Sequence, residues 1–148
     1  MTFLIAAAGT GGHVYPGLSV AEALVRLDVP KQDIMFVGGS RLESKVYPDQ
    51  GFPFLELELW GLKRSLSLRN LSLPAVVAKA KKRIQGAIKD FGVGSVLGMG
   101  GYVTIPTVLA ARRSKTPFFN SEQNADAGLA NRLSSRWARK SFGAFHIT

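Results

Sequence analysis

The chain has 148 residues, of which 46% are hydrophobic, 20% are charged and none is cysteine. This length and composition predict one folded domain and exclude disulfide bonds and thiolate metal sites. A net charge of +9 favours polyanionic partners: nucleic acid, an anionic membrane surface or phosphate-bearing substrates. The sequence contains neither a convincing signal peptide nor an apolar run long enough to span a bilayer, so we expect a soluble cytoplasmic domain.

Apolar strands alternate with helical patterns along the chain. We predict strands over residues 3–7, 34–37, 54–57, 95–97, 117–120 and 144–148, and helices over 16–27, 42–47, 73–89, 105–113 and 127–140. This alternation predicts an α/β fold, a Rossmann-like, doubly wound parallel sheet with helices on both faces. Because the chain ends on a predicted strand, we expect it to be half of a larger design.

A glycine loop follows the first predicted strand. Residues 9–17 read Gly-Thr-Gly-Gly-His-Val-Tyr-Pro-Gly, and Pro16 suits the first turn of a helix. A strand, a glycine loop and a helix start together form a geometry that holds phosphate through backbone N–H groups. His13 adds a side chain that can move protons near neutral pH. The alternative is an ordinary tight turn in which His13 is only hydrogen-bonded. We call residues 9–12 the first glycine loop.

A second glycine loop, residues 98–101, follows the fourth predicted strand and precedes Tyr102. If the first and fourth strands are neighbours, the two loops flank the point where ligands of such sheets bind, and a pair of cradles suits a diphosphate. Tyr102 either packs as an ordinary aromatic or directs its hydroxyl into the cleft. The fifth strand ends in polar residues 121–124, among which Glu122 and Gln123 stand at the same edge.

Two common nucleotide-binding patterns are missing. The second strand ends in Val-Gly-Gly-Ser-Arg at 37–41, without the acid that holds the ribose of NAD. No GxxxxGK[ST] motif for ATP occurs either. We therefore expect no dinucleotide cofactor and no ATPase activity.

These segments resemble the MurG glycosyltransferases of peptidoglycan synthesis. The matching stretches are residues 9–18, 98–103 and 122–124, together with Gly128-Leu129 and Asn131-Arg132. The resemblance implies the amino-terminal, acceptor-binding half, residues 1–148, of a two-domain GT-B enzyme whose carboxy-terminal donor-binding domain is absent here. It implies an inverting hexosyltransferase that moves N-acetylglucosamine from UDP-GlcNAc to lipid I, giving lipid II. The isolated half is then expected to be poorly active.

The resemblance also implies roles for individual residues. His13 is the first choice for the general base toward the acceptor 4-hydroxyl, with Glu122 as the runner-up. The residues implied in substrate binding are Thr10, Gly11, Gly12, Gly100, Gly101, Tyr102 and Asn124. One departure is Ser121, which stands where the family usually has histidine. No Asp-x-Asp pair occurs, which fits transfer without a metal ion, and the resemblance implies no cofactor.

A basic segment with leucines is the candidate membrane surface. From residue 60 to 89 there are eight Lys and Arg residues and no acid. The residues expected to lie against an anionic membrane are Trp60, Leu62, Lys63, Arg64, Leu66, Leu68 and Arg69. The apolar stripe of the following helix, residues 73–88, fits the core better than the membrane. The resemblance then implies a peripheral protein on the cytoplasmic face of the inner membrane.

Two other functions remain open at this point. One is a non-catalytic membrane-anchoring subunit that recruits a separate donor-binding subunit. The other is a basic nucleic-acid binder, which charge alone supports, because the sequence has neither a recognition-helix pattern nor interleaved aromatic residues. We therefore expect lipid I, UDP-GlcNAc and an anionic membrane as partners, and no nucleic acid.

Overall fold

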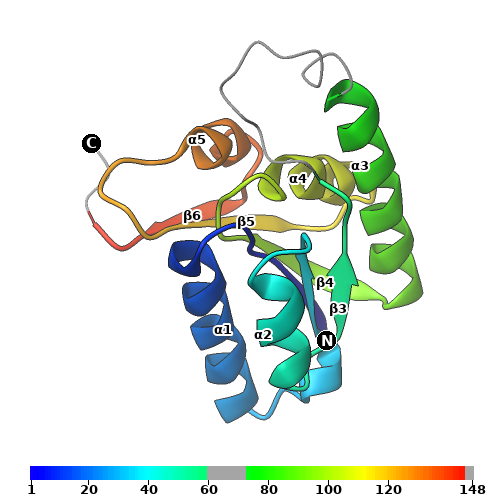
Figure 1. Ribbon diagram of the computed structural model, residues 1–148, viewed down its shortest axis with the longest axis vertical. Helices are drawn as coiled ribbons and strands as arrows, with labels where there is room; N and C mark the ends of the chain where they lie inside the picture. Colours follow the sequence, from blue (N-terminus) through cyan, green and yellow to red (C-terminus); the bar gives the residue numbers. More distant parts are fainter. Residues whose placement is uncertain (60–72, 146–148) are drawn as a thin grey trace.

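The computed structural model describes residues 1–59 and 73–145 as an α/β domain (Figure 1). The strands are β1 (Thr2–Ala6), β2 (Ile34–Gly38), β3 (Phe54–Glu56), β4 (Val93–Gly98), β5 (Phe118–Glu122) and β6 (Lys140–Gly143). The helices are α1 (Gly11–Arg26), the 3-10 turn η1 (Lys31–Asp33), α2 (Glu43–Asp49), α3 (Leu73–Asp90), α4 (Thr104–Arg113) and α5 (Leu129–Ser135). The residues expected on the membrane, Trp60 to Arg69, lie outside the described residues.

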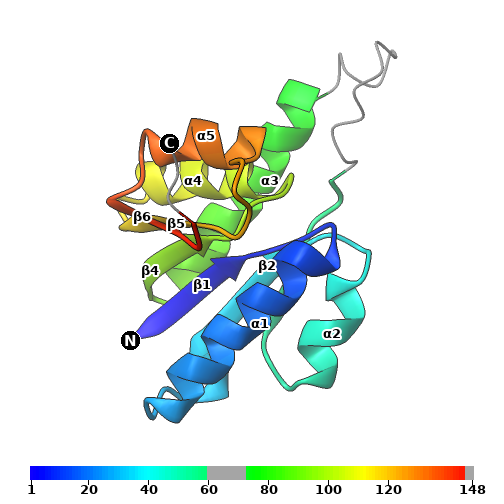
Figure 2. The same cartoon turned by 90° about the vertical axis from the view of Figure 1, so that its left-hand side faces the viewer.

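The strands form one parallel sheet in the order β3-β2-β1-β4-β5-β6. Figure 2 shows α1 and α2 on one face of the sheet and α3, α4 and α5 on the other. This arrangement confirms the predicted Rossmann-like, doubly wound fold. It also makes β1 and β4 neighbours, with Ala6 in register with Gly98, so the chain reverses its strand order beside the two glycine loops.

Side-chain alternation along the central strands builds a core on each face of the sheet. Leu4 of β1 packs in the cluster under α3 and α4, with Ile84 and Val108. Its neighbour Ile5 packs in the opposite cluster, under α1 and α2, with Phe36. Because successive strand residues point to opposite faces, both layers of helices are anchored to the same strands. The predicted apolar stripe of α3 is confirmed as core at Ala80, Ile84 and Ile88, whereas Val76, Val77 and Ala87 are half-buried.

The start of α1 differs from the prediction. The helix begins at Gly11, five residues before Pro16, because the Thr10 carbonyl accepts hydrogen bonds from the backbone of His13 and Val14. Pro16 therefore lies inside the helix and leaves the carbonyl of Gly12 without its usual partner. Gly12 is exposed, so water can satisfy that carbonyl at little cost. The consequence is that His13 belongs to the first turn of a helix rather than to a loop.

The carboxy-terminal elements also differ. The helix predicted over 127–140 is wrong in length, because α5 ends at Ser135 and the Arg139 amide donates to the Phe118 carbonyl, which draws the chain onto the sheet edge. The strand predicted over 144–148 is wrong as well. The edge strand β6 forms earlier, over Lys140–Gly143, while residues 144 and 145 are irregular and 146–148 lie outside the described residues.

Candidate active site

The two glycine loops meet at the carboxyl ends of β1 and β4. The Met99 amide donates to the Ala6 carbonyl at 2.9 Å, which holds the second loop against the end of β1. Gly100 and Gly101 have φ values of +96° and +80°, a region that side-chain-bearing residues rarely occupy. A Cβ on Gly101 would lie 2.5 Å from the Ala8 carbonyl oxygen. Only glycine therefore allows the backbones of the two loops to approach this closely.

His13 lies between the loops. A Cβ on Gly100 would stand 2.9 Å from the His13 Cδ2 and Nε2 atoms, so the imidazole edge rests directly against the second loop. On the other side of the ring, Nδ1 is 3.2 Å from the Thr10 hydroxyl oxygen. Burial lowers the pKa of His13 below its ordinary 6.5, although the Glu122 carboxylate and the Ala8 carbonyl each raise it. The ring is therefore neutral at pH 7 and available to accept a proton.

Glu122 ends β5 as a buried carboxylate with four donors. Its Oε1 accepts hydrogen bonds from the backbone and side-chain amides of Asn124, both at 2.9 Å. Its Oε2 accepts from the Gly128 amide at 3.0 Å and from the Asn131 side chain at 2.8 Å. Desolvation raises the pKa of Glu122, but these hydrogen bonds together lower it below its usual value. Glu122 is therefore a firmly ionised group that fixes the loop after β5.

Both predicted phosphate cradles adjoin helix starts that have no side-chain cap. Thr10 at the start of α1 and Val103 at the start of α4 form no side-chain cap, and neither helix has an acid in its first turn. Backbone N–H groups at such an end carry partial positive charge and attract anions. Gly11 and Gly12 are the first two residues of α1. Two helix starts without side-chain caps thus follow the neighbouring strands β1 and β4.

Tyr102 does not direct its hydroxyl into the open cleft. The hydroxyl donates to Glu43 Oε1 at 2.9 Å, and the ring lies over Gly9, where a Cβ would be 3.2 Å from Tyr102 Cε1. Burial, together with the hydrogen bond and charge of Glu43, raises the pKa of Tyr102, so it stays a donor. A groove of about 580 Å³ opens on the other side of the site, between Tyr15, Met99 and Glu122.

Most of the residues predicted for the site lie close together in the structure. The predicted residues Thr10, His13, Gly100, Gly101 and Tyr102 stand around one point, and Glu122 acts on His13 through its charge. Asn124 lies one step further out, bonded to Glu122. Two residues were missed. Asn131 matched the family but received no role, and Glu43 was not considered, although it is the first acid after the glycines that end the second strand.

Comparison with known proteins identifies the family. Residues 3–142 match the model of the glycosyltransferase family 28 N-terminal domain. The chain belongs to this family. The resemblance inferred from the sequence is thereby confirmed. Two expectations stay predictions: that a donor-binding domain completes this family 28 domain, and that the residues of the family 28 domain act as assigned.

Relatives of the family 28 domain are bacterial transferases. The UDP-N-acetylglucosamine--N-acetylmuramyl-(pentapeptide) pyrophosphoryl-undecaprenol N-acetylglucosamine transferase of Leuconostoc mesenteroides is 41% identical over 146 residues, which are 98% of this chain and 40% of the relative. The transferase of the same name from Amoebophilus asiaticus is 41% identical over 143 residues, 95% of this chain and 39% of the relative. The chain therefore spans about two fifths of the length of these curated relatives.

Solved structures agree with this assignment. The crystal structure of Acinetobacter baumannii MurG matches with a TM-score of 0.85 and 34% identity, over 99% of this chain and 42% of that one. The UDP-GlcNAc 2-epimerase of Methanocaldococcus jannaschii matches over 99% of this chain and 40% of that one, with a TM-score of 0.71 and 11% identity. At that identity the second match concerns the fold alone.

The neutral state of His13 in the family 28 domain is directly measurable. We expect NMR titration of the imidazole to give a pKa below 6.5, because burial outweighs the Glu122 charge. Glu122→Gln removes that charge and is expected to lower the His13 pKa further. Since the folded state then binds fewer protons than the unfolded state, the free energy of unfolding falls as the pH drops from about 6.5 toward the lowered pKa. A His13 pKa above 6.5 would contradict this electrostatic account; a His13→Gln variant assigns the resonance.

Proposed function

We propose that this domain binds the diphosphate of lipid I and presents its sugar 4-hydroxyl for transfer of N-acetylglucosamine from UDP-GlcNAc, giving lipid II. The proposal depends on the position of His13 between the two glycine loops. Each loop leads to the start of a helix that has no side-chain cap. The loops supply backbone donors for two phosphate groups, and the histidine stands beside them as a base. The names of the relatives support this substrate and this reaction.

In the proposed reaction His13 takes the proton of the acceptor hydroxyl. The hydroxyl oxygen forms a bond to the anomeric carbon of the donor sugar while the bond from that carbon to UDP breaks, so UDP leaves with the electron pair. For this role Nδ1 keeps its hydrogen, directed toward the Thr10 hydroxyl oxygen, and Nε2, beside the second glycine loop, carries the free lone pair. Attack from the face opposite UDP inverts the sugar, as the family resemblance implies.

Glu122 is the weaker candidate for the base. Each of its two oxygens accepts hydrogen bonds from two donors. Its lowered pKa also makes it a weak proton acceptor. Its negative charge instead favours the protonated His13 that forms during the reaction. Glu122 and Asn131 are therefore assigned to positioning and electrostatic support. A base seated at a phosphate cradle also favours a transferase over a membrane-anchoring subunit, which needs no such group.

The donor is held largely outside this domain. We assign most of the contacts with UDP-GlcNAc to a second domain, so this chain alone is expected to bind acceptor but to transfer poorly. The described part of the chain contains no group of three or more His, Cys, Asp or Glu side chains that could hold a metal ion. The chemistry assigned to His13 requires neither a metal nor a cofactor from this domain.

Acceptor binding tests the proposed function. The purified chain is titrated with lipid I in nanodiscs of neutral phosphatidylcholine, which removes the nonspecific attraction of the basic surface. The comparison ligand is undecaprenyl monophosphate in the same nanodiscs. We expect saturable binding of lipid I that is at least about tenfold tighter, because the second cradle adds charge-assisted hydrogen bonds. Equal binding of the two lipids, or binding of neither, would overturn the diphosphate assignment.

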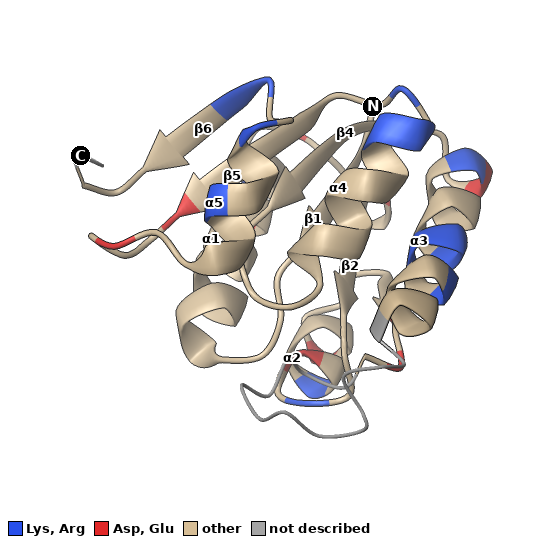
Figure 3. Cartoon of the chain, turned by 90° about the horizontal axis from the view of Figure 1, so that it is seen from above, with Lys and Arg blue, Asp and Glu red and all other residues tan. Residues whose placement is uncertain are grey.

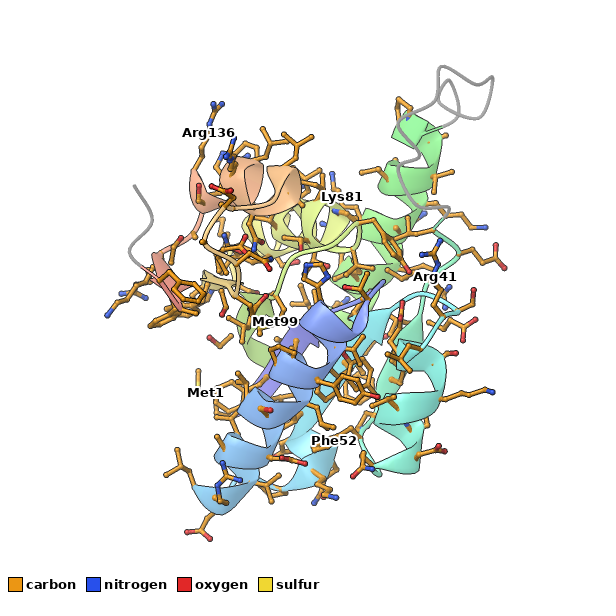
Figure 4. The ribbon with its side chains drawn as sticks, turned by 60° about the vertical axis from the view of Figure 1, so that its left-hand side comes forward. Met1, Arg41, Phe52, Lys81, Met99 and Arg136 are labelled. Atoms are coloured by element: carbon orange, nitrogen blue, oxygen red, sulfur yellow. The ribbon has the colours of Figure 1, made fainter. Side chains whose placement is uncertain are left out.

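We further propose that the domain docks peripherally on the cytoplasmic face of the membrane. Among residues 1–59 and 73–145, none of the helices combines the length and apolar character needed to cross a bilayer. Figure 3 shows Lys and Arg gathered along α3, the helix that follows the candidate membrane segment. In Figure 4, Lys81 of α3 and Arg136, which directly follows α5, both lie on the side of the sheet opposite α1. The helical layer on that side is the proposed membrane side.

Charge removal on α3 is expected to weaken this docking. Replacing Lys81, Lys82 and Arg83 by alanine should lower partitioning onto vesicles rich in anionic lipid by on the order of 100-fold at low salt, since each basic residue near the surface contributes about 1 kcal/mol. The matched control removes three cations outside that layer: Arg26 of α1, Lys31 of η1 and Lys45 of α2. Co-sedimentation measures both variants, and equal losses would argue for attraction by net charge rather than an oriented face.

A further inference from the structure

Glu43 is a fully buried carboxylate at the start of α2, with an exposed fraction of 0%. Its Oε1 accepts hydrogen bonds from the Gly39 amide and the Tyr102 hydroxyl, both at 2.9 Å. Its Oε2 accepts from the Gly9 amide at 3.3 Å. The three donors follow β1, β2 and β4, so one side chain connects three separate turns at the carboxyl edge of the sheet. Neither the phosphate cradles nor the base need this carboxylate directly.

The glycines around Glu43 leave room for it. A Cβ on Gly38 would lie 2.6 Å from Glu43 Cγ, and a Cβ on Gly39 would overlap the Tyr102 hydroxyl. Gly9, with φ +100°, provides the surface on which the Tyr102 ring lies. The packing of one carboxylate and one tyrosine thus accounts for these three glycines. Such close packing fixes the carboxylate in one position.

Burial of a charged carboxylate is costly unless donors surround it. Here two backbone amides and a tyrosine hydroxyl supply charge-assisted hydrogen bonds, which are stronger than those between neutral groups. Tyr102 adjoins Gly101 directly in the chain, and Gly9 begins the first glycine loop. A displacement of either loop would stretch a bond to the same buried charge, so the carboxylate resists independent movement of the loops.

We propose that Glu43 is a positioning residue that holds the two glycine loops at the separation a diphosphate requires. The proposal rests on the proposed function, because it assigns the diphosphate to these loops. Glu43 does not touch the substrate. It acts through the Gly9 amide on the first loop and through Tyr102 on the second. The expected signature is a loss of acceptor affinity that accompanies a change in both loops before any ligand is added.

Glu43→Gln tests this role with almost no change in shape. The amide keeps one acceptor oxygen for Gly39 and Tyr102 but places a donor opposite the Gly9 amide, so the connection to the first loop is lost. We expect lipid I in neutral nanodiscs to bind about tenfold more weakly. In the ligand-free chain, NMR should show shifted amide resonances in both loops, at Gly9 and at Gly101. Tyr102→Phe, a second variant in case the first folds poorly, should produce the same two effects more weakly.

Ile84→Val is the matched control. It removes one methylene from a fully buried side chain of α3, in the core cluster under α3 and α4, which contains no residue of either loop. We expect it to lower the melting temperature but not the affinity for lipid I. If Glu43→Gln shifts neither loop, or if its affinity equals that of wild type, the positioning role is overturned. If wild type itself does not bind lipid I, the proposed function fails, and the loop resonances then decide alone whether Glu43 couples the loops.

Discussion

Replacing Gly101 by alanine is expected to weaken lipid I binding by about 100-fold. The added Cβ would lie 2.5 Å from the Ala8 carbonyl oxygen, and the residue has φ +80°. Strain of this kind costs about 1–3 kcal/mol, and each 1.4 kcal/mol corresponds to a factor of about ten in affinity. The second glycine loop must therefore move away from β1, which separates the two phosphate cradles. Titration in neutral nanodiscs measures the loss.

Gly86→Ala provides the matched control for Gly101→Ala. Gly86 lies inside α3, and an added Cβ there meets nothing within 4 Å. The same chemical change should leave lipid I binding unchanged and raise the free energy of unfolding by about 0.5–1 kcal/mol, because alanine favours a helix more than glycine does. If Gly101→Ala binds lipid I as tightly as Gly86→Ala does, the second glycine loop is not the phosphate cradle.

The central sheet and the glycine loops were predictable because their signals are local. A short apolar run such as residues 3–7, followed by glycines, indicates a buried strand and a tight turn without knowledge of the rest of the chain. The neighbouring positions of β1 and β4 follow from the known strand order of doubly wound sheets. The residues that lie at the ends of these strands, His13 and Gly100 among them, could therefore be assigned to one site.

The elements that the sequence did not predict depend on contacts between distant segments. The early end of α5 is set by the Arg139 amide, which bonds to β5, and nothing near residue 135 indicates a stop. Glu43 lies 34 residues from Gly9 and 59 from Tyr102 in the chain, so its hydrogen bonds with these two residues exist only in the folded domain. From its sequence position alone, Glu43 looks like an ordinary acid in the first turn of a helix.

His13→Gln is expected to reduce sugar transfer by about 10²- to 10⁴-fold, the usual contribution of general-base catalysis, while lipid I binding changes little. Glutamine retains hydrogen-bonding atoms near Thr10 but has no group that can accept a proton at neutral pH. Transfer is measured after joining residues 1–148 to the remaining part of the Leuconostoc mesenteroides relative, which this chain does not match. Activity of the wild-type hybrid is the reference, and it should decline as the pH falls and His13 becomes protonated.

Comparing His13→Gln with Glu122→Gln distinguishes the residue that accepts the proton from the residue that supports it through its charge. His13→Gln should lose most of its turnover. The fall in turnover at low pH, the acid limb of the pH profile, should also disappear, because the imidazole whose protonation causes it is gone. Glu122→Gln keeps the imidazole but removes the charge that raises its pKa, so its acid limb should move to lower pH. If His13→Gln instead retains turnover within about tenfold of wild type and keeps the acid limb, the proton is accepted elsewhere, and the contacts of His13 with the two loops serve binding alone.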